Sequence, residues 1–139
     1  MELAEALRVA RNTHDSVLTT IRRDGRPALA NVLHYVRDDG VIIISTYAPT
    51  AKYQNLRREP WAALKVDAGS VWSYAVIEAE ADCSAVAADP HDAAVEELVE
   101  YYRQVGGEHS DWDEYRHAMV SEQRVAVRLT PTRVYGLLR

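Results

Sequence analysis

The chain has 139 residues, of which 47% are apolar, 27% charged and 8% aromatic. This length predicts a single domain over residues 1–139, and this apolar content excludes a disordered chain. The net charge of −5 excludes the broadly basic surface that general nucleic-acid binding needs. The sequence has no apolar run near the roughly 20 residues that cross a bilayer, and it has no signal-peptide pattern. Cys83 is its single cysteine. We therefore expect a soluble, cytoplasmic protein without membrane or nucleic-acid partners.

The first third of the chain predicts one helix and three strands. Apolar residues recur at helical spacing over residues 3–10. Residues 16–22 are rich in β-branched side chains and lead into Asp24-Gly25, a strong hairpin signal, so a return strand is expected over residues 27–36. Residues 41–46, VIIIST, begin with a continuous apolar run. That run predicts a strand that is buried on both faces.

The middle of the chain predicts a short helix followed by two strands. Pro49-Thr50 opens a helix over residues 51–58, which ends before Pro60 because the residue before a proline avoids the helical region. Residues 61–67 and 71–81 are expected to be strands on either side of a turn at Ala68-Gly69-Ser70.

The last third predicts two helices and two closing strands. Asp89-Pro90 has the pattern of a helix start, and that helix is expected to end at Gly106-Gly107. Ser110 resembles the first residue of a capping box for a helix to about residue 120. Residues 123–129 and 133–137 are expected to be separate strands around a proline. Six or seven strands, mostly linked by hairpins, indicate an antiparallel barrel with peripheral helices.

Several familiar catalytic motifs are absent, among them GxGxxG, Walker A, HExxH, CxxC and GxSxG. The ligand-type run at residues 108–111 straddles a helix start, so we expect a helix cap there and not a metal site. Cys83 is interpreted as a small apolar residue. Trp112 is expected to pack in a core and His34 to lie on a strand surface.

The most informative segment for function is residues 46–52, TYAPTAK. A buried strand there runs into a helix N-terminus, where unpaired N–H groups and the positive end of the helix dipole attract anions. Lys52 lies in the first turn, where a positive charge is unfavourable unless a negative group binds nearby. Thr50 can cap the helix and offer a hydroxyl, and Arg57 or Arg58 follows. The pattern fits a phosphate site; it also fits a capped helix whose lysine points into solvent.

Longer stretches of the chain resemble a known superfamily. The order strand–DGRP–strand, then VIIISTYAPTAKYQNLRREP, then VWSYAVIEA, resembles the pyridoxamine 5'-phosphate oxidase-like split-barrel proteins. The stretches GGEHSDWDEYRHAMV and RVYGL resemble the actinobacterial branch that depends on the deazaflavin coenzyme F-420. The resemblance spans about Ser16 to Leu137. It implies a split antiparallel β-barrel of the FMN-binding type that forms a homodimer with two cofactor sites at the subunit interface.

The resemblance also implies which residues bind the cofactor. Thr50, Ala51 and Lys52 match the segment that holds its phosphate, and Arg57 is expected to neutralise its glutamate tail. In the family, the strand that matches Asn31 and Val32 runs along the cofactor ring, and the position of Ser45 faces the ribityl chain. Leu56 matches an apolar wall, and Trp72 and Tyr74 match residues on the substrate side.

Two departures from the superfamily bear on the choice of cofactor. Its flavin mononucleotide (FMN) enzymes carry an arginine at the position of Ala30 and Ser-Arg-Lys in place of Thr50-Ala51-Lys52. The two missing arginines disfavour FMN and the pyridoxamine phosphate reaction. We expect an oxidoreductase that passes a hydride from reduced F-420 to a small electron-poor organic acceptor, with the hard chemistry supplied by the cofactor. No catalytic side chain and no metal are expected. An FMN oxidoreductase on the same fold and a non-catalytic carrier of a flavin-type cofactor are the alternatives.

Overall fold

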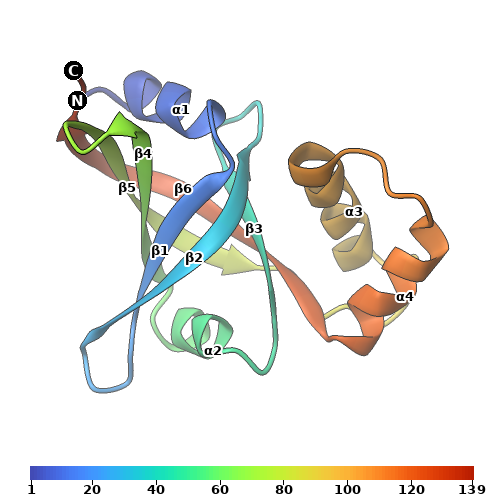
Figure 1. The fold of residues 1–139 in the computed structure, drawn as a ribbon. Helices are drawn as coiled ribbons and strands as arrows, with labels where there is room; N and C mark the ends of the chain where they lie inside the picture. Colours follow the sequence, from blue (N-terminus) through green and yellow to red (C-terminus); the bar gives the residue numbers. More distant parts are fainter.

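Six antiparallel strands close into a barrel with the order β1-β2-β3-β6-β5-β4 (Figure 1). The computed structural model describes all 139 residues. The elements in chain order are α1 (Leu3–Arg11), β1 (Asp15–Ile21), β2 (Pro27–Val36), β3 (Ile42–Tyr47), α2 (Ala51–Arg58), β4 (Trp61–Ser70), β5 (Ser73–Cys83), α3 (Ala93–Gly106), α4 (Trp112–Ser121) and β6 (Arg124–Leu137). The predicted antiparallel barrel with peripheral helices is confirmed.

The helices are distributed around the barrel in a way that leaves one side of the sheet bare. α1 lies at the end of the barrel where both termini meet, α2 lies at the opposite end, and α3 and α4 stand beside β3 and β6 (Figure 1). None of the helices has the length and apolar character needed to cross a membrane.

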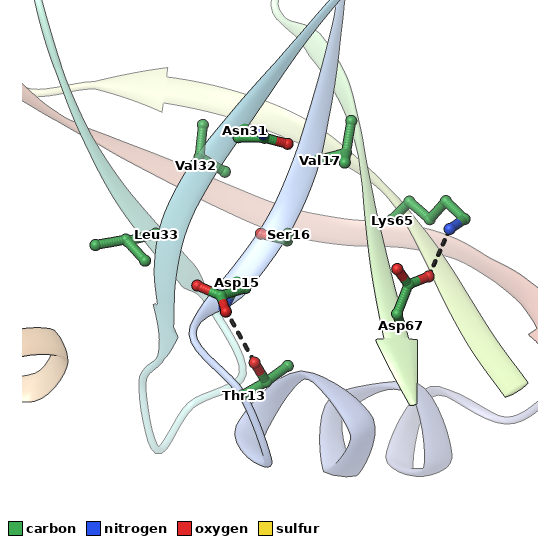
Figure 2. Close-up of a pocket in the computed structure, with 9 residues that line it drawn as sticks. All are labelled: Thr13, Asp15, Ser16, Val17, Asn31, Val32, Leu33, Lys65 and Asp67. Carbon is green, nitrogen blue, oxygen red and sulfur yellow. Dashed lines mark hydrogen bonds and ion pairs between the residues drawn. The ribbon is translucent and has the colours of Figure 1, made fainter. Parts of the chain in front are cut away.

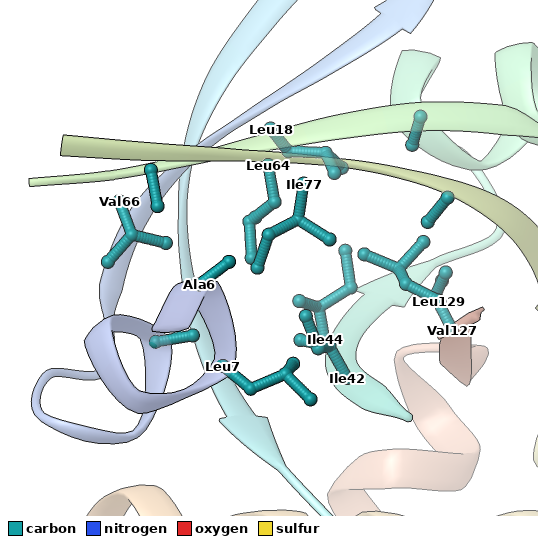
Figure 3. Packing of buried hydrophobic residues seen from close by; sticks show 14 of the residues in the cluster. Ala6, Leu7, Leu18, Ile42, Ile44, Leu64, Val66, Ile77, Val127 and Leu129 are labelled. Carbon is teal, nitrogen blue, oxygen red and sulfur yellow. The ribbon is translucent and has the colours of Figure 1, made fainter. Parts of the chain in front are cut away.

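The barrel interior is filled by aliphatic side chains from every strand (Figure 3). β3 is buried on both faces, as predicted: Ile42 and Ile44 point into the barrel, whereas Ile43 packs with Leu98 of α3 in a second apolar cluster. Burying a side chain of this size contributes about 1.5–3 kcal/mol relative to leaving it exposed. The packing of α3 against β3 therefore fixes the strand that leads into α2.

The C-terminal prediction of two strands is wrong, because β6 continues through Pro131 as one strand. Ala79 pairs with Pro131, but Glu78 already pairs with Arg133, so the extra residue Thr132 forms a bulge. The Thr132 hydroxyl donates to the Glu78 carbonyl at 3.2 Å. A bulge lets a strand accept a proline, which has no N–H for the ladder.

The turn between β4 and β5 also lies further along the chain than predicted. β4 extends to Ser70, and the register shifts between Asp67 and Ser70. Gly69 has a φ of 98°, a conformation that glycine adopts without strain. The glycine therefore forms an irregularity within the hairpin, and the exposed Val71 and Trp72 occupy the turn.

Both C-terminal helices begin later than predicted, because a different aspartate caps each one. Asp92 accepts the Val95 N–H at 2.9 Å and starts α3, whereas Asp89 belongs to the preceding turn. Asp111 accepts the Glu114 N–H at 3.1 Å and starts α4, in place of Ser110. Aspartate side chains satisfy the free N–H groups of a first turn in this way.

The prediction that His34 lies on the surface is wrong: its side chain is 0% exposed. Nε2 lies 2.8 Å from the carbonyl oxygen of Ala10, at the end of α1, and Nδ1 lies 2.7 Å from the hydroxyl of Ser16 on β1. A carbonyl only accepts, so Nε2 carries the proton and Ser16 donates to Nδ1. His34 therefore joins α1 to β1 and β2 through a buried polar contact.

Candidate functional site

β2 and β3 pair with each other over only part of their length. Their ladder contains three pairs, from His34 opposite Ile44 to Val36 opposite Ile42. The rest of β2, residues 27–33, pairs with β1 alone, and the rest of β3 pairs with β6. We call residues 27–33 of β2 the open edge. It marks where the barrel is split.

Backbone polar groups line the open edge at alternate residues. His34 donates its N–H to the His14 carbonyl, and at the other end of the hairpin Arg22 donates to the Arg26 carbonyl. Antiparallel bonding alternates along a strand, so the even-numbered residues of β2 bond to β1 and the odd-numbered residues face the other way. Asn31 therefore directs its N–H and C=O toward the side where no strand pairs with it. These groups are suited to hydrogen-bond the edge of a planar heterocycle.

α2 starts four residues after β3, and its first turn is capped by Thr50. The Thr50 hydroxyl donates to the Tyr47 carbonyl at 2.8 Å, and it lies 2.8 Å from the Thr46 hydroxyl and 3.3 Å from the Tyr53 N–H. Its one proton and both lone pairs are thus used within the protein. The hydroxyl that the sequence suggested as a phosphate ligand acts as a helix cap.

The capped turn nevertheless leaves donors for an anion. The N–H groups of Ala51 and Lys52 precede the first intrahelical bond of α2, which runs from Gln54 to Thr50. The first turn carries no acidic residue, and Lys52 is half-buried within it. Two N–H groups and the positive end of the helix dipole therefore lie near the end of β3, with a lysine in the same turn.

Arg124 is a further cation near the end of β3, and the sequence did not reveal it. It pairs across the strands with Tyr47, and its guanidinium lies 4.7 Å from the centre of the Tyr47 ring. Glu122 binds the same guanidinium at 2.8 Å. β6 is remote from the Thr50–Lys52 segment in sequence, so only the strand pairing brings them together. Arg57 is exposed and lies over the ring of Tyr53, at 5.6 Å.

Three other predicted site residues have constrained positions. Leu56 is 2% exposed and belongs to the barrel core, so its side chain supports α2 from inside. Val32 also packs against the core, which leaves its backbone as the part nearer the surface. Ser45 is half-buried on β3. Nearby, the hydroxyl of Tyr101 on α3 donates a hydrogen bond of 2.8 Å to the carbonyl of Leu33. This bond occupies the last residue of the open edge, next to His34.

A cavity of about 560 Å³ lies on the bare outer face of β1, β2 and β4 (Figure 2). Asn31 and Val32 contribute to its lining, as does the ion pair of Lys65 and Asp67, whose charged atoms are 2.5 Å apart. The same ion pair and Tyr74 line an adjoining cavity of about 550 Å³. Lys65 and Asp67 did not stand out in the sequence, because they are two residues apart in one strand and belong to no recognised motif.

Large apolar side chains are exposed around these cavities. Leu29 is 66% exposed, Val71 81% and Trp72 60%. Leu33 and Tyr135 are about half exposed on the neighbouring strands. Leu33 lines the first cavity and Val71 the second, and exposed apolar side chains in such positions are typical of interaction surfaces.

The predicted site residues therefore form two groups on one chain. Ser45, Thr50, Ala51, Lys52 and Arg57 lie around β3 and α2. Asn31 lines the first cavity, Tyr74 lines the second, and Trp72 is at the β4–β5 turn beside it. Asn31 itself belongs to the open edge of β2, which therefore forms part of the second group.

The other residues singled out in the sequence have structural surroundings. Trp112 packs edge-on against Tyr102 and Tyr115, with ring centres 5.7 and 5.6 Å apart, so the packing prediction is confirmed. Cys83 is half-buried, and burial raises the pKa of its thiol. The His109 ring lies tilted against that of Tyr102, with ring centres 5.1 Å apart, and its Nδ1 accepts a hydrogen bond of 2.8 Å from the Asp111 N–H.

Solved structures with the same fold differ in what their names describe. A conserved hypothetical protein from Mycobacterium tuberculosis superposes with a TM-score of 0.73 at 24% identity, covering 96% of this chain and 82% of that one. An F420 reductase gives 0.70 at 18%, covering 92% and 94%. A heme storage protein from Vibrio cholerae gives 0.68 at 14%, covering 99% and 96%. These similarities establish the fold alone.

The sequence itself matches a family over nearly its whole length. The model of the family described as "Pyridoxamine 5'-phosphate oxidase" aligns with residues 3–138. The closed six-stranded antiparallel barrel with its peripheral helices agrees with that assignment. The chain is therefore a member of the pyridoxamine 5'-phosphate oxidase family.

Proposed function

We propose that this protein is an oxidoreductase of the actinobacterial deazaflavin type, which binds coenzyme F-420 and reduces a small electron-poor organic acceptor. One observation carries the proposal: Lys52 and two free N–H groups of α2 lie at the end of the strand that borders the split in the barrel. A phosphate at α2 would direct a bound ring toward the open edge of β2. The structural similarity to a protein named F420 reductase supports this choice.

The protein's own contribution is to bind and orient. Lys52 and the N–H groups of Ala51 and Lys52 would hold the phosphate, with Arg124 adding positive charge and Arg57 placed for a more distant carboxylate. The backbone of Asn31 would hydrogen-bond the ring edge. When bound, the reduced deazaflavin supplies the hydride. Trp72 and Tyr74 would border the substrate side, and water supplies the proton to the acceptor.

A binding and turnover experiment tests the proposal against its two alternatives. The purified protein is titrated with F-420 and with FMN while cofactor fluorescence is followed, and reduced F-420 is then offered with a quinone. Oxidation of F-420 that depends on both protein and quinone supports the enzyme. Tight F-420 binding without turnover, across a panel of quinones, unsaturated ketones and nitro compounds, favours a carrier. Stoichiometric FMN in the purified protein favours the FMN oxidoreductase.

We expect F-420 to bind more tightly than FMN, because the arginines that the FMN enzymes carry are replaced by Ala30 and Ala51. Ala51 is exposed at the first helical position, so Ala51→Arg adds a phosphate partner without disturbing the core. A new charge-assisted contact should raise FMN affinity about tenfold. Fluorescence titration of the parent and Ala51→Arg proteins measures both values. Equal FMN affinity in the two proteins would contradict the assignment of this helix start to the phosphate.

We also propose a two-fold homodimer through the bare face of β1, β2, β4 and β5. Its exposed leucine, valine and tryptophan side chains support a self-complementary interface. We expect a dimer by light scattering at micromolar concentration. Leu29→Asp should shift it to monomer, because the carboxylate would be buried without a partner. Leu3→Asp is the matched control, since Leu3 is an exposed leucine on α1. A monomeric parent protein would refute the dimer.

A further inference from the structure

The buried side of α2 carries one polar side chain between apolar ones. Tyr53 and Leu56 belong to the barrel core, whereas Asn55 is 6% exposed. The Asn55 amide nitrogen donates a hydrogen bond of 3.1 Å to the hydroxyl of Thr20 on β1, which is 1% exposed. An apolar contact tolerates rotation and sliding, but a hydrogen bond requires a particular distance and direction.

Arg58 completes this contact from the next turn of the helix. Its guanidinium donates to the Asn55 side-chain oxygen at 3.1 Å and to the Ile21 carbonyl at 2.6 Å. The oxygen and the nitrogen of the Asn55 amide therefore each have a partner. The C-terminal half of α2 is tied by these bonds to the last two residues of β1.

The direction of α2 decides where its first-turn N–H groups point. The helix starts beside the end of β3, and its contacts with β1 come one turn later at Asn55 and at its last residue, Arg58, so the β1 contacts follow the anion donors along the helix. At about 1.5 Å per residue the two contacts lie about 5–10 Å along the helix axis from the first-turn donors, and a tilt of about 10° at the β1 contact would move those donors by roughly 1–2 Å. That displacement is enough to break a hydrogen bond to a bound anion.

From this geometry we propose that Asn55 is a positioning residue. Together with Thr20 and Arg58, it sets the direction in which α2 presents Lys52 and the free N–H groups of its first turn. The identity of the anion as a cofactor phosphate rests on the proposed function above. The fixed direction of the helix does not depend on it.

A paired substitution separates positioning from stability. Replacing both partners of a buried hydrogen bond with apolar side chains of similar shape is often nearly neutral for stability. Thr20→Val combined with Asn55→Leu therefore keeps the burial and removes the directional contact. We compare the unfolding midpoint, the residual dipolar couplings of backbone amides in the free protein, and the F-420 dissociation constant from fluorescence titration.

We expect the paired variant to unfold near the parent midpoint, with barrel couplings that fit the parent structure and couplings over residues 51–58 that do not. The F-420 dissociation constant should rise about tenfold, the effect of losing one well-aligned hydrogen bond to a charged group. Ser73→Ala is the matched control. Ser73 is 3% exposed and hydrogen-bonds to the backbone of Arg139 near the opposite end of the barrel. This variant should lose stability without changing the α2 couplings.

Parent-like α2 couplings in the paired variant would overturn the proposal. Changed couplings with unchanged F-420 affinity would support the positioning of α2 and refute the proposed phosphate site. A parent that does not bind F-420 would refute the proposed function, and the α2 couplings would then decide the positioning by themselves. Arg58→Ala gives a second test with less risk to folding, because this arginine is exposed. It should shift the same α2 couplings by a smaller amount, and unchanged couplings there would also count against the proposal.

Discussion

Lys52→Ala should weaken F-420 binding by roughly ten- to hundredfold while leaving the fold intact. A charge-assisted contact in a partly desolvated site contributes about 1.5–3 kcal/mol, which corresponds to that loss of affinity. Lys52 lies in a first turn that has no acidic residue to pair with it, so its removal leaves no buried partner unsatisfied. Alanine is also the better helix former, and the unfolding midpoint should change little. Fluorescence titration and thermal unfolding of the same preparation measure both effects.

Arg22→Ala is the control for a general loss of positive charge. Arg22 is an exposed arginine at the β1–β2 turn, paired with Asp24 at 3.0 Å. It lies outside both groups of site residues, so this variant should bind F-420 like the parent. Equal weakening by both substitutions would mean that net charge, and not the helix start, governs binding. Parent-like binding by Lys52→Ala would remove α2 from the cofactor site.

Local patterns predicted the elements whose signals lie within a few neighbouring residues. Three such elements form as expected: the N-terminal helix, the hairpin at Asp24-Gly25 and the start of α2 after Pro49-Thr50. Each depends on backbone preferences that act over one turn. Residues 50–52 were identified as a candidate site segment for the same reason, because a capping threonine and a lysine in the first turn are visible without the rest of the chain.

The features that sequence reasoning missed depend on partners far along the chain. Thr132 bulges because Glu78 already pairs with Arg133, and a strand pattern cannot reveal that register. Arg124 lies beside Tyr47 at the end of β3 because β6 pairs with β3. Thr50 looked available to a ligand until the structure placed the Thr46 hydroxyl and the Tyr47 carbonyl against it. A residue's type indicates which bonds it can form, but tertiary contacts decide which of them remain free.

His34 shows the same limit of local patterns: it lies in an alternating strand, and only the tertiary structure shows that it is buried and hydrogen-bonded. His34→Leu should lower the free energy of unfolding by about 2–4 kcal/mol, because it leaves the Ala10 carbonyl and the Ser16 hydroxyl buried without their partner. The His14 side chain bonds to the His34 backbone carbonyl at 2.8 Å and remains in place. His117→Leu, an exposed histidine on α4, is the control. Denaturant unfolding at neutral pH measures the difference, and a loss no larger than that of the control would contradict the buried contact.

The same contact should make the parent protein less stable in mild acid. Burial is the main cause that lowers the pKa of the His34 imidazole in the folded state, and the neighbouring His14 lowers it further, whereas the Ala10 carbonyl and Asp15 oppose the shift. The unfolded chain, with a histidine pKa near 6.5, therefore binds more protons than the folded one as the pH falls below that value. Stability is fully present above about pH 7.5 and declines toward pH 5, by at most about 1.4 kcal/mol per pH unit for one such group. Unfolding free energies between pH 5 and 8 should show this decline in the parent and in His117→Leu. In His34→Leu the curve should be lower and flatter, because the residue that resists protonation has been removed; a parent-like slope there would place the acid sensitivity elsewhere.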